Sequence, residues 1–188
     1  MEAFLISTGI VALAEIGDKT QLLALVLAAQ FRKPVPIILG ILVATLANHF
    51  MAGAAGAWVA AIVGPDAMRW ILGLSFIAMA IWILVPDRLD DDDQQDTTPR
   101  FGVFGTTVVA FFLLEMGDKT QIATVALAAK YSSLVAVVCG TTLGMMLANV
   151  PAVLLGEVAA SRLPMHVVHR VAAAIFLALG VSVLLFRG

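Results

Sequence analysis

Two copies of one charged heptapeptide contain most of the residues in this sequence that could do chemistry. The first copy, EIGDKTQ, extends from Glu15 to Gln21, and the second copy, EMGDKTQ, extends from Glu115 to Gln121. Both copies lie inside apolar stretches. A gapless alignment of residues 15–40 with residues 115–140 gives 11 identities in 26 positions. The chain is therefore predicted to consist of two related halves, each with one acidic motif.

The motif side chains offer oxygen ligands for a hard divalent cation. Residues three apart on a continuous helix share a face, so a helix through the motif would group its Glu, Asp and Gln. Carboxylate and amide oxygens suit Mg²⁺, Mn²⁺ or Ca²⁺, and no His or Cys stands beside the motifs to favour Zn²⁺ or Cu⁺. If the copies meet, repulsion among four carboxylates favours proton uptake, and cation binding would displace those protons. The predicted metal ligands are Glu15, Asp18, Gln21, Glu115, Asp118 and Gln121.

The basic residues Lys19 and Lys119 allow another interpretation of the motif. Each stands four residues after its Glu, which is the spacing of a helical ion pair, so a structural pair that only neutralises charge is an alternative to an ion site. Each ammonium could also reach the membrane surface on its long side chain. Thr20 and Thr120 are expected to hydrogen-bond helix backbone carbonyls.

Three polar residues outside the motifs are further candidates. Asn48 and Asn149 stand in matching Leu-Ala-Asn triplets and could each bind the cation or hydrogen-bond a neighbouring helix. His49 could relay protons, but Val150 takes its place in the second half, and His169 is expected near the membrane interface.

The composition is that of an integral membrane protein. Hydrophobic residues make up 61% of the chain and charged residues 13%, with a mean hydropathy of +1.01, whereas soluble domains carry about 25% charged residues. The net charge of −2 and the lack of a basic stripe exclude nucleic-acid binding. Cys139 is the single cysteine, so an internal disulfide is excluded. The N-terminus has no basic region and is predicted to begin a first span, not a signal peptide.

The apolar runs predict six transmembrane helices, because a bilayer core of about 30 Å needs roughly 20 apolar residues for each helix. Three spans in each half place the second half in the opposite orientation, so the fold class is an all-α integral membrane protein built as two inverted three-helix repeats. Such repeats place the site at their interface near mid-membrane. The predicted spans are 3–30, 35–61, 67–86, 102–130, 134–160 and 166–186, within a first repeat 1–86, an acidic loop 87–101 and a second repeat 102–188.

The motif-bearing spans are unusual in length and in charge. Charges at a helix centre cost about 2.5 to 3.5 kcal/mol each, so the three charges of a motif oppose insertion by about 8 to 10 kcal/mol. Leu, Ile, Val and Phe between Ala3 and Ala29 return only about 4 to 7 kcal/mol. The charges must therefore find partners or water in the folded protein. Gly17 and Gly117 suggest a bend or break at each motif, and a tilted continuous helix is the alternative.

The distribution of basic residues predicts the orientation of the chain in the membrane, including the side on which the acidic loop lies. The aspartates of residues 87–101, including the run from Asp90 to Asp93, are expected to form a solvated tether, and cation binding there is the alternative. Six Lys or Arg residues on one side of the membrane against three on the other predict a cytoplasmic acidic loop and periplasmic termini.

The two heptapeptides carry an E-x-G-D-K/R-T/S signature, and the chain resembles a widespread family of small Golgi and bacterial membrane proteins that transport manganese and calcium. The resemblance covers nearly the whole chain. It implies exchange of Mn²⁺ or Ca²⁺ for protons, with manganese export by the bacterial members. It also implies that Glu15, Asp18, Glu115 and Asp118 carry the cation. The short chain looks bacterial, which implies the inner membrane.

These observations favour a secondary transporter that exports Mn²⁺ in exchange for protons. A Ca²⁺/proton antiporter is the closest variant, and a passive divalent-cation channel is an alternative of another class. An intramembrane enzyme would need a nucleophile that the sequence does not show, and a structural subunit would not need two acidic clusters. The expected partners are a divalent metal ion and the lipid bilayer. No cofactor is expected, and the oligomeric state is left open.

Overall fold

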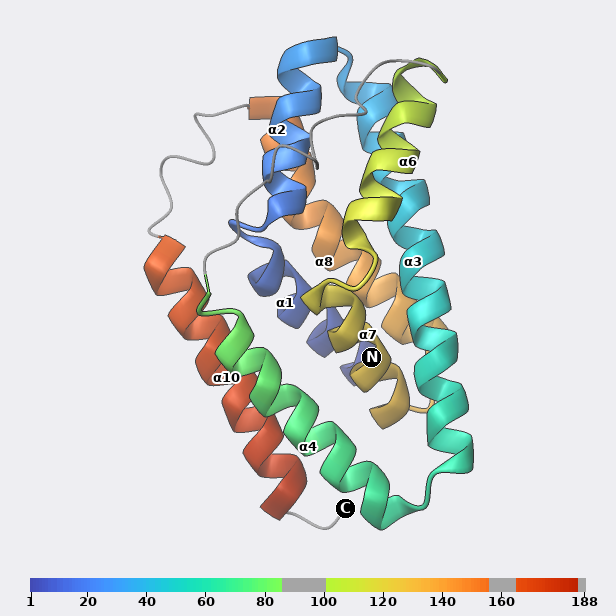
Figure 1. The fold of residues 1–188 in the computed structure, drawn as a ribbon, viewed down its shortest axis with the longest axis vertical. Coiled ribbons are helices and arrows are strands. Elements are labelled where there is room, and N and C mark those ends of the chain that lie inside the picture. The colour runs from blue at the N-terminus through green and yellow to red at the C-terminus, as the bar shows by residue number, and fades with distance from the viewer. Residues whose placement is uncertain (86–100, 156–164, 186–188) are drawn as a thin grey trace.

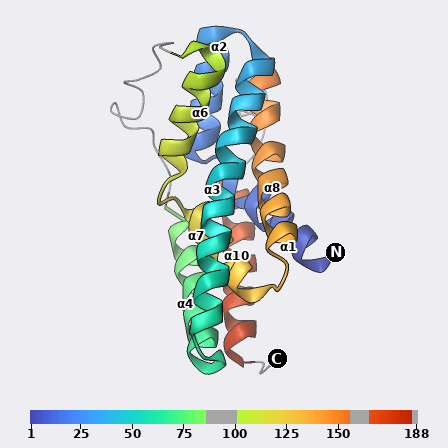
Figure 2. The same cartoon turned by 90° about the vertical axis from the view of Figure 1, so that its right-hand side faces the viewer.

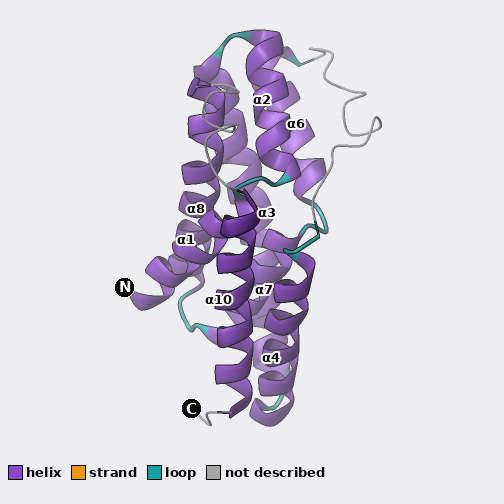
Figure 3. Cartoon of the chain, turned by 90° about the vertical axis from the view of Figure 1, so that its left-hand side faces the viewer, coloured by secondary structure: helices purple, strands orange, loops and turns teal. Residues whose placement is uncertain are grey.

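The computed structural model describes residues 1–85, 101–155 and 165–185, and all regular secondary structure in these ranges is helical (Figure 3). The all-α class is thus confirmed for this part of the chain. The predicted acidic loop lies outside the described residues except for Phe101, as do the last residues of the predicted third, fifth and sixth spans. The helices are α1 (Glu2–Glu15), α2 (Lys19–Phe31), α3 (Pro34–Ile62), α4 (Pro65–Trp82), α6 (Gly102–Glu115), α7 (Lys119–Lys130), α8 (Leu134–Leu155) and α10 (Met165–Leu185).

The helix is interrupted at both motifs, as the glycines suggested, and the alternative of a continuous tilted helix is wrong. Gly17 has a φ of 84° and Gly117 a φ of 80°, values that glycine adopts without the steric cost of a Cβ. The next residue, Asp18 or Asp118, then stands at the N-cap of the second helix. One helical face therefore does not group the motif residues, because a break separates each Glu from the Asp and Gln that follow it.

The two interrupted segments lie in the middle of the bundle and point in opposite directions (Figure 1). From its break, α2 extends toward one end of the molecule, whereas α7 extends from its break toward the other end. The long helices α3 and α8 support both segments, since α1 packs along α8, and α6 and α7 pack along α3. The breaks are thereby held near the middle of the long axis.

The remaining helices, α4 and α10, pack against each other at the end opposite α2 (Figure 2). The rings of Phe76 and Phe176 lie 6.2 Å apart in this contact. A Cβ on Gly73 would come within 2.4 Å of Leu184, so the glycine allows the helices to approach closely. The pair also packs against α7 and α1.

Two apolar clusters flank the motifs. One cluster combines α1, α4, α7 and α10 with the start of α8, and Ile10, Phe76 and Phe176 are among its buried members. The other combines α2, α3, α6 and α8, with Leu23 and Phe111 among its members. Each interrupted segment contributes to one cluster before its break and to the other cluster after it. The polar motifs therefore form a layer between two apolar regions.

The surface and the helix lengths are those of a helical membrane protein. Within the described residues, three helices are long and apolar enough to cross a membrane, at Pro34–Ile62, Leu134–Leu155 and His166–Leu185. Large apolar side chains such as Phe50 and Trp58 are exposed on the outside of the bundle, as a lipid-facing surface requires. The interrupted segments consist of shorter helices, and α4 is not among these three, so the predicted six crossings stay a prediction.

Candidate functional site

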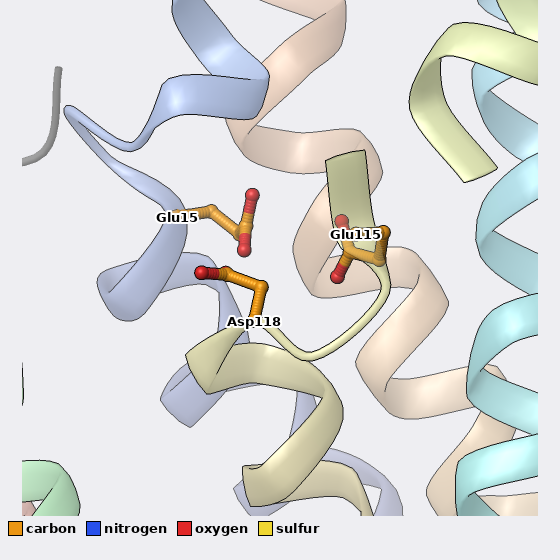
Figure 4. Close-up of side chains that lie close together, drawn as sticks. All are labelled: Glu15, Glu115 and Asp118. Carbon is orange, nitrogen blue, oxygen red and sulfur yellow. The ribbon is translucent and has the colours of Figure 1, made fainter. Parts of the chain in front are cut away.

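Three carboxylates from both motif copies converge at the breaks. One carboxylate oxygen from each of Glu15, Glu115 and Asp118 lies within 4.8 Å of the other two, and the three residues are only 0%, 1% and 4% exposed. Figure 4 shows them approaching from the end of α1, the end of α6 and the start of α7. Opposed ligands of one Ca²⁺ lie about 4.6 to 5.2 Å apart, and those of one Mg²⁺ about 4.0 to 4.2 Å apart. The group therefore has the dimensions of a site for one divalent cation.

The fourth predicted carboxylate, Asp18, forms an ion pair with the second copy of the motif. Its Oδ1 lies 2.5 Å from Nζ of Lys119, and both side chains are buried. This pair joins Asp18 of one copy to Lys119 of the other copy, whereas the spacing of the sequence suggested a Glu-to-Lys pair within one motif. Lys119 is 1% exposed and does not reach the membrane surface. Lys19 is partly exposed.

The motif threonines hold the two glutamates. The hydroxyl of Thr20 donates a hydrogen bond of 2.6 Å to Oε2 of Glu15, and that of Thr120 donates one of 2.5 Å to Oε1 of Glu115. The expectation that these hydroxyls serve backbone carbonyls is wrong. The other carboxylate oxygen of each glutamate is buried and makes no hydrogen bond, so each glutamate has one oxygen fixed by a threonine and one oxygen available to a cation.

The motif glutamines stabilise the breaks. Oε1 of Gln21 accepts a hydrogen bond of 2.9 Å from the Gly17 amide, and Oε1 of Gln121 accepts one of 2.8 Å from the Gly117 amide. The Nε2 groups differ, since Gln21 donates to the carbonyl of Ala148 and Gln121 donates to Oδ1 of Asn48. Each glutamine thus satisfies a backbone amide that the break removes from the helix. Cation binding by Gln21 and Gln121 remains a proposal.

The two asparagines are both buried but make different contacts. Asn48 in α3 donates a hydrogen bond of 3.0 Å to the carbonyl of Phe112 in α6, which matches the expected interhelical bond. Asn149 in α8 donates to the carbonyl of Met145 in its own helix, and its Oδ1 is buried without a hydrogen bond. As cation ligands, Asn48 and Asn149 also remain proposals.

Two histidines lie closer to the motifs than the sequence indicated. Nε2 of His49 is 3.6 Å from Oε1 of Glu115, and the ring is fully buried. Nε2 of His169 in α10 is 3.0 Å from the carbonyl of Ile16 in the first break. In the sequence, the only indication that His49 lies near the motifs was its position directly after the candidate ligand Asn48. The sequence did not predict the contact between His169 and Ile16, because this contact depends on how α10 packs.

The site carries an excess of negative charge if every carboxylate is ionised. Glu15 interacts electrostatically with the carboxylates of Glu115, Asp18 and Asp118. Lys119 supplies one buried ammonium, so four carboxylates against one ammonium leave three negative charges in excess. Such an excess in a buried layer is costly. The arrangement therefore favours binding of cations, either protons or a metal ion.

Comparisons with known proteins agree with this chemistry. The family model described as "Divalent cation/proton antiporter GDT1" matches residues 3–91 and 103–187. A protein of Vibrio cholerae serotype O1 that carries the name "Putative manganese exporter" is 49% identical over 187 residues, which cover 99% of this chain and 92% of that protein. The "GDT1-like protein 3" sequences of the indica and japonica subspecies of Oryza sativa are 26% identical over 205 residues, which cover 96% of this chain and 73% of each relative. No solved structure matches.

The family match spans nearly all of both halves, and the relative from Vibrio cholerae is similar along almost its whole length. The family consists of transporters, not of enzymes, and the apolar helices are consistent with a multi-pass membrane protein. The chain therefore belongs to the GDT1 family of divalent cation/proton antiporters, as the resemblance of its two motifs implied.

Proposed function

We propose that the protein exports Mn²⁺ across a bacterial inner membrane in exchange for protons, through one site that both motif copies share. The observation that carries this proposal is the convergence of Glu15, Glu115 and Asp118 in a buried group. Oxygen ligands of this kind suit Mn²⁺ and Ca²⁺. The name of the Vibrio cholerae relative, which describes a manganese exporter, favours Mn²⁺.

The proposal includes six crossings arranged as two inverted repeats, residues 1–86 and 102–188, joined by a cytoplasmic loop at 87–101, with both termini in the periplasm. The opposite directions of α2 and α7 support the inversion. The packing supports it as well, because α1 of the first half packs along α8 of the second, and α6 of the second half packs along α3 of the first. In an inverted pair of three-helix units, the first helix of each half packs along a long helix of the other half, as α1 and α6 do here.

The exchange of ions follows from the charge of the site. A divalent cation lowers the excess negative charge from three to one, whereas an empty site keeps all three charges unless protons bind. Protons and the metal ion therefore compete for the same carboxylate oxygens. In this proposal Glu15, Glu115 and Asp118 bind either the metal ion or protons. Asp18 and Lys119 keep the two copies of the motif together in the conformation described.

Transport by purified protein in liposomes tests the proposal. An imposed pH gradient is expected to drive Mn²⁺ against its concentration gradient, and Glu115→Gln is expected to abolish that movement. Ser182→Ala is a suitable control, since its hydroxyl donates only to a carbonyl within α10. Flux that ignores the pH gradient would instead indicate a passive channel, and Ca²⁺ flux that exceeds Mn²⁺ flux would indicate the calcium variant.

A further inference from the structure

The buried ring of His49 is a polar group in the cation site that the proposed exchange of ions does not use. It is 0% exposed in α3, and neither of its ring nitrogens makes a hydrogen bond. A buried polar group without a hydrogen bond is unfavourable by about 1 to 3 kcal/mol. A residue kept at that cost beside Glu115 is expected to have a partner in another state of the protein.

The position of the ring shows which partner would fit. Nε2 lies 3.6 Å from Oε1 of Glu115. This oxygen also accepts the hydrogen bond from Thr120, and its second lone pair can bind an ion. Two ligands of one octahedral ion with bonds near 2.1 Å are about 3.0 Å apart when adjacent and about 4.2 Å apart when opposed. The observed separation lies between these values, so one ion bound by that lone pair could bind the imidazole after a small shift.

The chemistry of the imidazole limits the class of ion. Imidazole nitrogen is a good ligand for first-row transition metals, whereas Ca²⁺ and Mg²⁺ prefer oxygen. The carboxylates of the site alone would accept either class. We propose that His49 is a nitrogen ligand of the transported cation and selects transition-metal ions over Ca²⁺ and Mg²⁺. This inference rests on the proposed function, because it concerns the same site.

The second half of the chain provides a matched variant. Asn149 is followed by Val150, where Asn48 is followed by His49, so the nitrogen comes from one half only. His49→Val gives the first half the residue that the second half already has at the corresponding place. His49→Gln serves as a second variant if the valine protein does not fold, because it keeps a polar side chain without the imidazole.

Pulsed electron paramagnetic resonance of Mn²⁺ bound to the purified protein tests the inference directly, because imidazole coordination gives a ¹⁴N modulation. The modulation is expected in the wild-type protein and in His166→Val, a control at an exposed histidine. It is expected to be absent in His49→Val. Mn²⁺ affinity should fall by about tenfold to a hundredfold in His49→Val, while Ca²⁺ affinity changes by less than about threefold.

Two results would overturn the inference and leave the proposed function intact. One is bound Mn²⁺ without a ¹⁴N modulation in the wild-type protein that nevertheless exchanges Mn²⁺ for protons. The other is an equal loss of Mn²⁺ and Ca²⁺ affinity in both His49 variants, which would indicate a structural role for the ring. A wild-type protein that binds neither ion would overturn the proposed function itself, and the inference with it.

Discussion

The two copies of the motif have nearly the same sequence and the same local structure, but their surroundings differ. In both copies the threonine holds the glutamate and the glutamine holds the glycine amide. The lysines differ, since Lys119 is buried against Asp18 and Lys19 is partly exposed. The heptapeptide therefore determines contacts across its own break, whereas contacts between the halves depend on how the halves are placed.

The helices of the third predicted span in each half, α4 and α10, also lie in unequal surroundings. The α4–α10 pair packs against α1 and α7, and it contributes to the apolar cluster at that end of the bundle. If the halves are inverted repeats, exchanging their roles would move this pair toward α2 and α6. The two halves therefore have unequal neighbours in this conformation.

The largest expected effects come from substitutions of the two motif aspartates. Asp118 belongs to the proposed cation site, whereas Asp18 pairs with Lys119. Asp118→Asn should weaken Mn²⁺ binding about a hundredfold, because it removes a charged ligand, and it should leave the unfolding free energy unchanged or raise it. Asp18→Asn should lower the unfolding free energy by about 3 to 5 kcal/mol, because it breaks the buried ion pair with Lys119. Metal titration and denaturant unfolding in detergent measure the two effects. Equal behaviour of the two variants would contradict the comparison.

The lysines give the next largest difference. Lys119→Gln should lower the unfolding free energy by about 3 to 5 kcal/mol, because it breaks the buried ion pair with Asp18. Lys19→Gln should change the unfolding free energy by less than about 1 kcal/mol, because solvent weakens the interactions of a partly exposed charge. The same unfolding measurement on both proteins serves as its own control. A larger effect at Lys19 than at Lys119 would show that the conformation described here is not the most populated one.

Substitution of the two motif threonines should weaken Mn²⁺ binding to the same extent. Thr20→Val and Thr120→Val each remove a hydrogen bond to a glutamate that is ionised when it binds a metal ion, and such a bond is worth about 1.5 to 3 kcal/mol. Mn²⁺ affinity should fall by roughly tenfold to a hundredfold in both variants. Titration of each variant with Mn²⁺ checks this. A loss in only one variant would mean that a single glutamate binds the ion.

The smallest effect is expected at a break. Gly117 has positive φ and open space where a Cβ would lie, so Gly117→Ala carries only the conformational cost of about 1 to 2 kcal/mol. Denaturant unfolding measures that cost. Gly105→Ala is the contrasting variant, because its Cβ would clash with Phe101 at 2.6 Å without a φ penalty. No measurable cost at Gly117 would argue against the break.

Much of this molecule was predictable from local sequence patterns. Helical class, apolar segments and a weak point at each motif glycine followed from hydropathy and from the conformational freedom of glycine. The meeting of acids from both copies was expected from the inversion of the two halves, whereas the expected grouping within one motif was wrong. A helical face was invoked for Glu15 and Asp18, whereas the break places Glu15 at the end of one helix and Asp18 at the start of another.

The contacts that were missed are those that join distant parts of the chain. The pairing of Lys119 with Asp18 could not be distinguished from a pairing within one motif, because both satisfy the same charges. The approach of His49 to Glu115 and of His169 to Ile16 depends on the rotation of α3 and α10 about their axes. Hydrophobic periodicity does not determine that rotation in helices that are apolar on nearly all sides.

The central claim is that both halves share one metal ion. A structure of the protein with bound Mn²⁺, with the ion located by its anomalous scattering, tests it most directly. We expect one ion bound by Glu15 of the first copy together with Glu115 and Asp118 of the second. An ion bound by residues of a single copy, or bound only by the acidic residues between 87 and 101, would contradict it.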